Sequence, residues 1–87
     1  MTRMFEMRQK EVINIRDGFR FGFLYDIGID MCSGTVIEII IPGPSKMFGI
    51  FGFDHEYRIP FVAIKQIGED VILVDVDTEK VLIQCEF

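Results

Sequence analysis

Residues 35–42, TVIEIIIP, predict the fold class of this chain more strongly than any other stretch. β-Branched residues dominate the stretch, and they favour β-strands because their side chains pack well on a pleated sheet. Both alternating faces are apolar apart from Glu38, which is typical of a central strand covered on both sides. Pro42 and Pro44 end the predicted strand, since proline has no N–H to donate to a neighbouring strand.

Short strand-like segments continue on both sides of this central run. Turn signals recur about every 8–12 residues, a spacing typical of a small antiparallel barrel or sandwich. Only residues 4–9 and 61–64 are expected to form single helical turns. The predicted strands are residues 12–15, 19–30, 35–42, 56–60, 65–67, 71–76 and 81–87, and the predicted turns are 16–18, 32–34, 68–70 and 77–80. The sequence therefore predicts an all-β fold.

The segment FRFGFLYDIGID, residues 19–30, is expected to form one long strand. Its large apolar residues alternate, which predicts that they share one face of that strand. Glycines inside a strand often mark a bulge or a strong bend, so we expect the strand to be coiled as at a barrel corner. The predicted shared face carries Phe21, Phe23, Tyr25, Ile27 and Ile29.

The composition is unusually apolar for a small protein. Of the 87 residues, 49% are hydrophobic, and the mean hydropathy is +0.31. A chain of this length is expected to form one domain, residues 1–87, which buries only about 60–65% of its extended-chain surface. We therefore expect part of the surplus apolar surface to be buried by self-association, with a homodimer as the predicted state.

The charge of the chain argues against a nucleic-acid partner. The formal net charge is −5, so phosphate backbones are repelled and nonspecific binding lacks its usual driving force. The basic residues are concentrated near the N-terminus, where residues 1–20 hold five bases and three acids. Residues 54–87 hold eight acids and three bases. These scattered N-terminal charges are interpreted as an ordinary solvated face.

Residues 45–54, SKMFGIFGFD, form an apolar connection where a polar loop is expected. Two explanations stay open for this segment. It folds as a lid over the open end of a barrel, or it presents its apolar side chains to a partner molecule. The predicted interaction residues are Met47, Phe48, Ile50, Phe51 and Phe53.

Few residues in the chain have the pattern of a reactive site. His55 is the single histidine and is predicted to be a solvated loop residue. Ser33 and Ser45 lie in turns without a partner base. Asp75 and Asp77 share a strand face, but a solvated acidic edge explains them better than a cation site. We therefore predict no enzyme activity, no catalytic residues, no cofactor and no metal.

The N-terminal residues MTRMFEMRQKEV lack the apolar run of a leader peptide. No apolar run approaches the ~20 residues of a membrane-spanning helix. Cys32 and Cys85 have no metal-binding or redox spacing and are expected to be reduced structural thiols. These observations predict a cytoplasmic location and no membrane span.

The order of motifs along residues 4–75 resembles the PRC-barrel domain. The most specific part is the ordered set of PGP at residues 42–44, IP at 59–60 and IGEDVILV at 67–74. VINI at residues 12–15 and DG at 17–18 fit the same pattern. The resemblance is strongest to the small stand-alone branch associated with sporulation in Firmicutes, the YlmC/YmxH type.

This resemblance implies a six-stranded, partly open antiparallel β-barrel with a core at residues 4–75. Residues 76–87 then form a C-terminal extension with an extra strand. The fold also occurs in the H subunit of photosynthetic reaction centres and in a ribosome-maturation factor, where it binds other macromolecules. The chain departs from the family pattern at four aromatic positions. Phe5, Phe23 and Tyr25 are bulkier and more apolar than the usual residues, and Phe61 replaces a tryptophan.

Three functional hypotheses follow. The first is a non-enzymatic protein–protein interaction or adaptor module that acts as a homodimer in a sporulation-related process. The second is an RNA- or ribosome-associated maturation factor, which rests on fold analogy and is opposed by the net negative charge. The third is a small-molecule or metal-binding protein, which rests on the glycines of the loop at residues 45–54 and on the acids.

Overall fold

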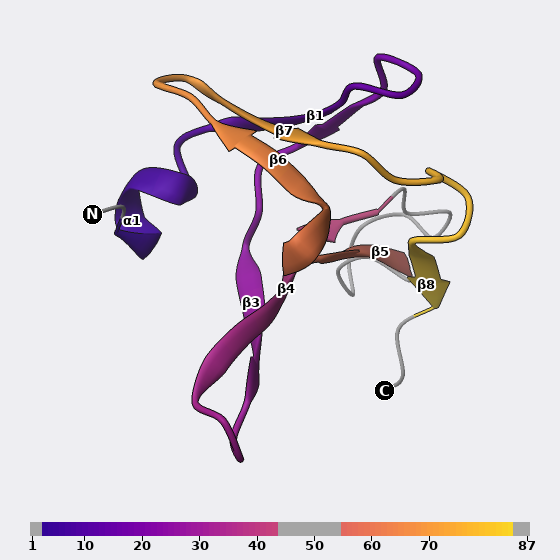
Figure 1. The fold of residues 1–87 in the computed structure, drawn as a ribbon. Coiled ribbons are helices and arrows are strands. Elements are labelled where there is room, and N and C mark those ends of the chain that lie inside the picture. The colour runs from indigo at the N-terminus through magenta and orange to yellow at the C-terminus, as the bar shows by residue number, and fades with distance from the viewer. Residues whose placement is uncertain (1–2, 44–54, 85–87) are drawn as a thin grey trace, which may run out of the picture.

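The computed structural model describes residues 3–43 and 55–84, and most of these residues lie in short β-strands (Figure 1). One helical turn, α1 (Met4–Met7), precedes the strands, and a 3-10 turn, η1 (Phe61–Ala63), follows the fifth. Both turns were predicted from the sequence. The strands are β1 (Glu11–Asn14), β2 (Arg20–Gly22), β3 (Asp26–Asp30), β4 (Thr35–Pro42), β5 (His55–Pro60), β6 (Ile64–Ile67), β7 (Val71–Val74) and β8 (Leu82–Gln84). The predicted all-β fold is confirmed.

The first sheet has the strand order β2-β1-β7-β6. The outer pairs β1–β2 and β6–β7 are antiparallel, but β1 and β7 run parallel, with Glu11 opposite Val71 and Asn14 opposite Val74. The antiparallel expectation was therefore wrong for this one pair. Parallel neighbours need a long crossover connection, and three strands of the second sheet, β3, β4 and β5, lie between β1 and β7 in the sequence.

The second sheet has the order β3-β4-β5-β8, and all its pairs are antiparallel. β4 is the longest strand described and lies between β3 and β5, as its apolar residues predicted. β8 adds to the outer edge of β5, with Tyr57 opposite Leu82. This is the predicted extra C-terminal strand. The two sheets remain separate ladders, so the barrel is partly open, as expected.

The core lies between the two sheets and is built from alternate residues of their strands. Val12 and Asn14 of β1 are buried, as are Ile72 and Val74 of β7, because every second side chain points inward. Asn14 and Glu56 are the polar residues buried in the described part of the chain, and Asn14 is fully buried. The buried apolar residues are Met7, Val12, Phe21, Leu24, Ile39, Ile40, Ile41, Tyr57, Ile59, Ile72, Val74, Val76 and Val81.

The predicted strand over residues 19–30 is broken into two strands that belong to different sheets. β2 ends at Gly22, whose φ of 101° takes the chain out of the first sheet in a conformation that favours glycine. Residues 23–25 cross to the second sheet, where β3 begins at Asp26. The alternation is lost at this crossing, so Phe23 is exposed and Leu24 is buried. The predicted shared face was therefore wrong across the crossing, although Ile27 and Ile29 do share one face of β3.

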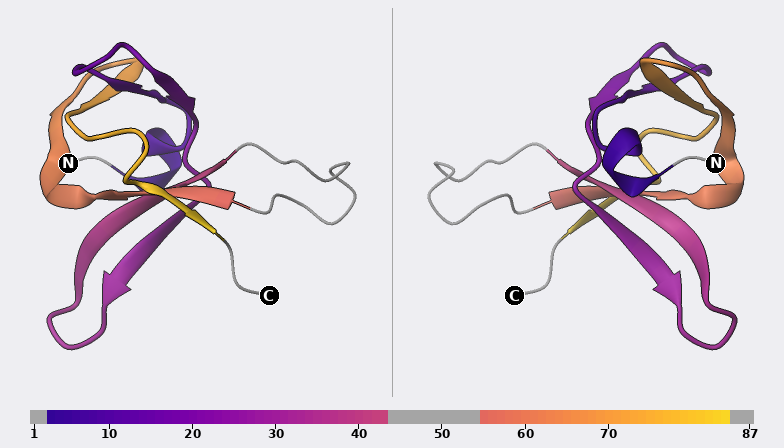
Figure 2. Two further views of the ribbon diagram at one scale, coloured as in Figure 1. Left: turned by 90° about the vertical axis from the view of Figure 1, so that its right-hand side faces the viewer. Right: turned by 90° about the vertical axis from the view of Figure 1, so that its left-hand side faces the viewer.

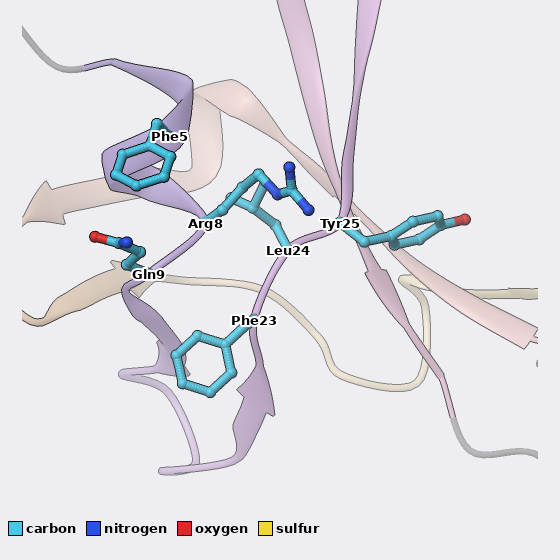
Figure 3. Close-up of a pocket in the computed structure, with 6 residues that line it drawn as sticks. All are labelled: Phe5, Arg8, Gln9, Phe23, Leu24 and Tyr25. Atoms are coloured by element: carbon cyan, nitrogen blue, oxygen red, sulfur yellow. The ribbon is translucent and has the colours of Figure 1, made fainter.

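Several views show that the hairpin of β3 and β4 extends away from the rest of the structure (Figures 1 and 2). α1 lies at one side of the molecule, between the first sheet and the hairpin (Figure 1), and close to the segment that crosses between the sheets (Figure 3). Within residues 3–43 and 55–84, no helix has the length and apolar character needed to cross a membrane.

Candidate interaction surfaces

The outer half of the β3–β4 hairpin is a two-stranded ribbon. β5 pairs with β4 only as far as Pro60, which lies opposite Glu38. Beyond that point, β3 is the only described strand that pairs with β4, and β3 is itself an edge strand. An isolated two-stranded ribbon is at best marginally stable in water. The outer half of this hairpin is therefore a natural place for further contacts.

The two faces of this hairpin differ in polarity, because successive side chains of a strand point to opposite faces. The cross-strand pairs place aliphatic residues together on the face that continues from the core. We call this the apolar hairpin face, and it carries Ile27, Ile29, Val36 and Ile39. The opposite face carries Asp26, Gly28, Asp30 and Glu38, with Glu38 lying directly over Gly28. The hairpin is thus amphipathic along its length.

Burial falls along the hairpin from the body toward its tip. Ile39 is fully buried, Ile29 is 49% exposed, and Met31 at the tip is 87% exposed. Gly28 lies opposite Glu38 and Ile29 lies opposite Val36, so Ile37 is an extra residue in β4 that forms a β-bulge. Ile37 is itself 50% exposed. The outer hairpin therefore presents three large aliphatic or thioether side chains to solvent.

A second surface is an open pocket of about 470 Å³ between α1 and the segment that crosses between the sheets. The helical turn and the residues after it contribute one wall, and residues 23–25 contribute the other (Figure 3). Two phenylalanines at its rim, Phe5 and Phe23, are 69% and 52% exposed. The pocket is lined by Phe5, Arg8, Gln9, Phe23, Leu24 and Tyr25. We call this the aromatic pocket.

The floor of the aromatic pocket is fixed by packing and by one buried carboxylate. Leu24 is 3% exposed and belongs to the hydrophobic core. The ring of Tyr25 points away from the helical turn, and its hydroxyl donates a 2.9 Å hydrogen bond to Glu56 Oε1 (Figure 3). Glu56 is 6% exposed and also pairs with Arg58, whose Nε lies 2.6 Å from Oε2. Residues 23–25 are thereby held against β5.

Sequence comparison assigns a family to this all-β chain with its partly open barrel. A family model described as "PRC-barrel domain" matches residues 3–81. The chain belongs to the PRC-barrel family. The match begins before α1 and ends just before β8, so it includes both walls of the aromatic pocket and the whole β3–β4 hairpin.

Small proteins of the PRC-barrel family from two bacteria are similar to most of this chain. "Probable sporulation protein YlmC" of Bacillus subtilis is 40% identical over 74 residues, which cover 85% of this chain and 91% of the relative. "Uncharacterized protein CA_C1697" of Clostridium acetobutylicum is 42% identical and covers 82% and 80% of the two chains. "Uncharacterized protein YmxH" of B. subtilis is 34% identical and covers 88% and 92%.

The interaction residues predicted from the sequence lie outside the part of this PRC-barrel chain that the structure describes. These are Met47, Phe48, Ile50, Phe51 and Phe53, and Cys85 also lies outside it. The hairpin and the pocket are therefore additional candidate surfaces that the sequence did not identify as sites. One signal did point to the pocket. Phe5, Phe23 and Tyr25 stood out as bulkier and more apolar than the family pattern, although they were not connected to one another.

The remaining candidate residues are found in structural roles or on the surface. His55 begins β5 and is half-buried, so the prediction of a solvated loop histidine was wrong. It was wrong because pairing of β5 with β8 continues to this residue, opposite Gln84. Asp75 Oδ1 accepts a 2.9 Å hydrogen bond from Arg16 Nε. Within the two described ranges, no three His, Cys, Asp or Glu side chains are grouped as a metal site requires.

Ion pairs occupy several of the arginines of this PRC-barrel domain. Arg20 donates hydrogen bonds of 3.0 and 2.6 Å to the two carboxylate oxygens of Glu11, and this contact lowers the pKa of Glu11. Arg16 and Arg58 are paired with Asp75 and Glu56. By contrast, the Arg8 guanidinium in the aromatic pocket has no hydrogen bond or ion pair with any residue that the structure describes.

Proposed function

We propose that this chain is a non-enzymatic adaptor that associates as a homodimer and acts through protein–protein contacts in a sporulation-related process in the cytoplasm. The relation to sporulation is supported by the 40% identical relative whose name refers to it. The adaptor role is supported by the exposed apolar surface of the described residues. The observation that carries the proposal is the apolar face of the projecting hairpin.

This apolar hairpin face suits a second copy of the same chain. The acids of the hairpin lie on the opposite face, so two apolar faces can meet without bringing carboxylates together. Residues 21–43 contain three acids and no Lys or Arg, so an acidic partner has no basic group to bind there. A contact between two identical aliphatic surfaces is self-complementary, as a twofold-symmetric dimer requires.

The free energy available from this contact is useful for so small a domain. Ile29 and Ile37 are already half-buried, so completing their burial contributes about 1 kcal/mol each. Met31 is almost fully exposed and contributes about 2 kcal/mol when it is covered. A symmetric dimer counts each of these contributions twice, which makes about 8 kcal/mol before the entropic cost of association. Because this cost is subtracted, a micromolar dissociation constant is the strongest that the hairpin contact alone can give.

The apolar segment 45–54 is proposed as a further part of the interaction surface. Its five large apolar residues exceed what a small core accommodates, and a protein partner is the simplest way to remove them from water. The residues proposed to make this contact are Met47, Phe48, Ile50, Phe51 and Phe53. Their contribution is tested separately from that of the hairpin.

The RNA-binding hypothesis has less support. Arg16, Arg20 and Arg58 are each engaged with a carboxylate, so their charges are partly neutralised for a phosphate ligand. The net charge of −5 opposes the same ligand. The small-molecule hypothesis is likewise weaker, because the aromatic pocket is open and its phenylalanines are more than half exposed. We therefore retain the adaptor as the proposed function.

Sedimentation velocity of the full chain between 1 and 100 μM, on the order of the expected dissociation constant, tests the dimer. The double substitution Ile29→Ser with Ile37→Ser is expected to shift the chain to monomer across this range. Ile15→Ser is the matched control, because Ile15 is also an isoleucine with 52% exposure but lies outside the hairpin. It should leave the dimer intact.

The loop is tested in parallel with Phe48→Ser combined with Phe51→Ser. If this pair alone abolishes the dimer, the loop rather than the hairpin is the interface. A wild-type chain that remains monomeric at every concentration contradicts the homodimer proposal. Circular dichroism of each variant shows whether the fold has been kept.

A further inference from the structure

The aromatic pocket carries a second inference, which concerns a different surface from the proposed dimer contact. We propose that this pocket binds an extended acidic peptide segment of a partner protein, in which a carboxylate lies next to a large apolar side chain. This peptide site rests on the proposed adaptor function, because the pocket would be the surface through which the adaptor binds its partner.

Arg8 gives the pocket a positive charge. Its guanidinium lines the pocket and is unpaired among the described residues, whereas three other arginines are held by carboxylates. Arginine pairs favourably with a carboxylate because its planar N–H groups match the two oxygens. Figure 3 shows the side chain extending from the helical turn toward Leu24. A ligand carboxylate is the group that complements this position.

The local charge around α1 supports the same ligand. Arg3 and Arg8 lie beside this helical turn, and Glu6 is the acid within it, while the Lys10 ammonium is engaged by the backbone oxygens of Gly68 and Glu69. Glu11 follows closely but is engaged by Arg20, which removes it as a competitor for Arg8. The pocket therefore lies in a locally basic region of an acidic protein. Attraction of an acidic segment is short-ranged and should weaken as salt is added.

The aromatic rim of the pocket provides the apolar part of the contact. Phe5 and Phe23 are more than half exposed on either side of the buried Leu24, so the pocket has an apolar floor with two rings above it. Aromatic residues and arginine are enriched where proteins bind one another. An apolar side chain placed between the rings removes all three groups from water.

The open shape of the pocket favours a peptide over a small molecule. The pocket is open, and its exposed rings cannot enclose a free ligand as small-molecule sites do. The backbone N–H groups of Phe23 and Leu24 form no hydrogen bond with any described residue, although the next residue, Tyr25, donates to Ile40. Unpaired backbone in an extended segment suits pairing with the backbone of another extended chain.

The test uses the full chain labelled with ¹⁵N and two synthetic peptides. The first is an acetylated tetrapeptide that alternates glutamate with phenylalanine and leucine, and the second has lysine in place of each glutamate. Amide chemical shifts are followed during titration at low salt. We expect the acidic peptide to shift the amides of Phe5, Arg8, Gln9 and residues 23–25, with saturation at millimolar or lower concentration. The basic peptide should leave these amides unchanged.

Two substitutions and a matched control locate the contact. Arg8→Gln should weaken binding of the acidic peptide about three- to tenfold, as expected for the loss of one charged partner. Lys80→Gln removes the same charge from an exposed site outside the pocket and should change binding less than twofold. Phe23→Ser should also weaken binding, and its thermal midpoint should stay close to that of the wild type because Phe23 is exposed.

Other outcomes overturn the proposal. Equal binding of the acidic and basic peptides contradicts the role of Arg8, and so does an unchanged affinity after Arg8→Gln. If 3-phenylpropionate shifts the same amides at lower concentration than the peptide, the pocket is a small-molecule site. If Phe23→Ser dissociates the dimer in sedimentation, the pocket belongs to the contact between copies. Failure of the hairpin dimer alone leaves the peptide titration unaffected, so the two proposals are separable.

Discussion

Replacement of Asn14 by alanine is expected to destabilise this protein more than any other single polar substitution among the described residues. Asn14 is fully buried on β1, and its side chain binds the backbone just after β7. Its Nδ2 donates to Val76 O at 2.8 Å and to Thr78 Oγ1 at 3.2 Å, and its Oδ1 accepts from Val76 N at 3.2 Å. The amide therefore satisfies both backbone groups of Val76, where the β7 strand has ended.

The size of the effect follows from the groups left behind. Val76 is 7% exposed, so without Asn14 its N–H and C=O lose their partners in a place that water reaches poorly. Each unpaired buried group costs about 1–3 kcal/mol. The variant no longer buries the Asn14 amide itself, which offsets part of this cost. We expect a net loss of about 2–4 kcal/mol, out of a total of about 4–13 kcal/mol for a chain of this length.

Urea unfolding followed by circular dichroism measures this loss at one fixed protein concentration. With a denaturant slope of about 1–2 kcal/mol per molar, the midpoint should fall by about 1–4 M. Gln66→Ala is the control, because Gln66 is an exposed amide and its removal should cost less than about 0.5 kcal/mol. If Asn14→Ala and Gln66→Ala have the same midpoint, the hydrogen bonds between the Asn14 amide and Val76 do not stabilise the fold.

A second variant at the same position gives a pH signature. Asn14→Asp keeps the shape but, when ionised, has no hydrogen to donate to Val76 O. Burial raises the pKa of the introduced carboxyl above its unfolded value of about 4. The free-energy cost of burying the ionised carboxylate is therefore absent below about pH 4, and it grows as pH rises above that value. The gap in unfolding free energy between this variant and the wild type should be larger at pH 7 than at pH 4.

Three further predictions concern pH and packing. The pKa of Asp17 is lowered, chiefly because its carboxylate accepts a hydrogen bond from the backbone N–H of Phe19. The ionised carboxylate therefore stabilises the fold above its unfolded pKa, and this stability is lost as pH falls below about 4. The thermal unfolding midpoint of Asp17→Asn should match that of the wild type at pH 3 and fall below it at pH 7. Burial raises the pKa of Tyr57, so stability should decline above pH 10, the usual value, and Tyr57→Phe should remove that decline in alkaline unfolding curves. Gly43→Ala places a Cβ 2.8 Å from the backbone oxygen of His55 and should cost about 1–3 kcal/mol in urea unfolding, because backbone has to move; a neutral effect would contradict the close approach of β4 and β5.

The strands and turns were predictable where the sequence had one dominant local signal. Residues 35–42 form β4 with the predicted bounds, and the turn at residues 16–18 ends at Gly18, whose φ is 74°. The family was predictable because ordered motifs extend over most of the chain. Local pattern succeeds in these places because strand propensity and turn geometry are properties of a few neighbouring residues.

The sequence reasoning failed where the chain leaves one sheet for the other. An alternating pattern in residues 19–30 is compatible with one long strand, and only the positive φ of Gly22 and the burial of Leu24 reveal the crossing. The aromatic pocket depends on that crossing, because it brings residues 23–25 beside α1. The same difficulty explains why the parallel pairing of β1 and β7 was not foreseen. Contacts between distant segments leave no periodic trace in the sequence.

The parallel pairing of β1 with β7 also sets the order in which this protein is completed during synthesis. β1 is made early in synthesis, but its parallel partner β7 is made only after β3, β4 and β5 of the second sheet, and β8 follows β7. The β3–β4–β5 strands are close in sequence and meet first, since short loops close at little entropic cost. The pairing of β1 with β7 and the Asn14 contact with Val76 form later, and β8 completes the second sheet last. A chain released before residue 71 therefore contains a β1 that pairs with β2 but lacks β7 on its other edge, and this open edge makes truncated products prone to aggregation.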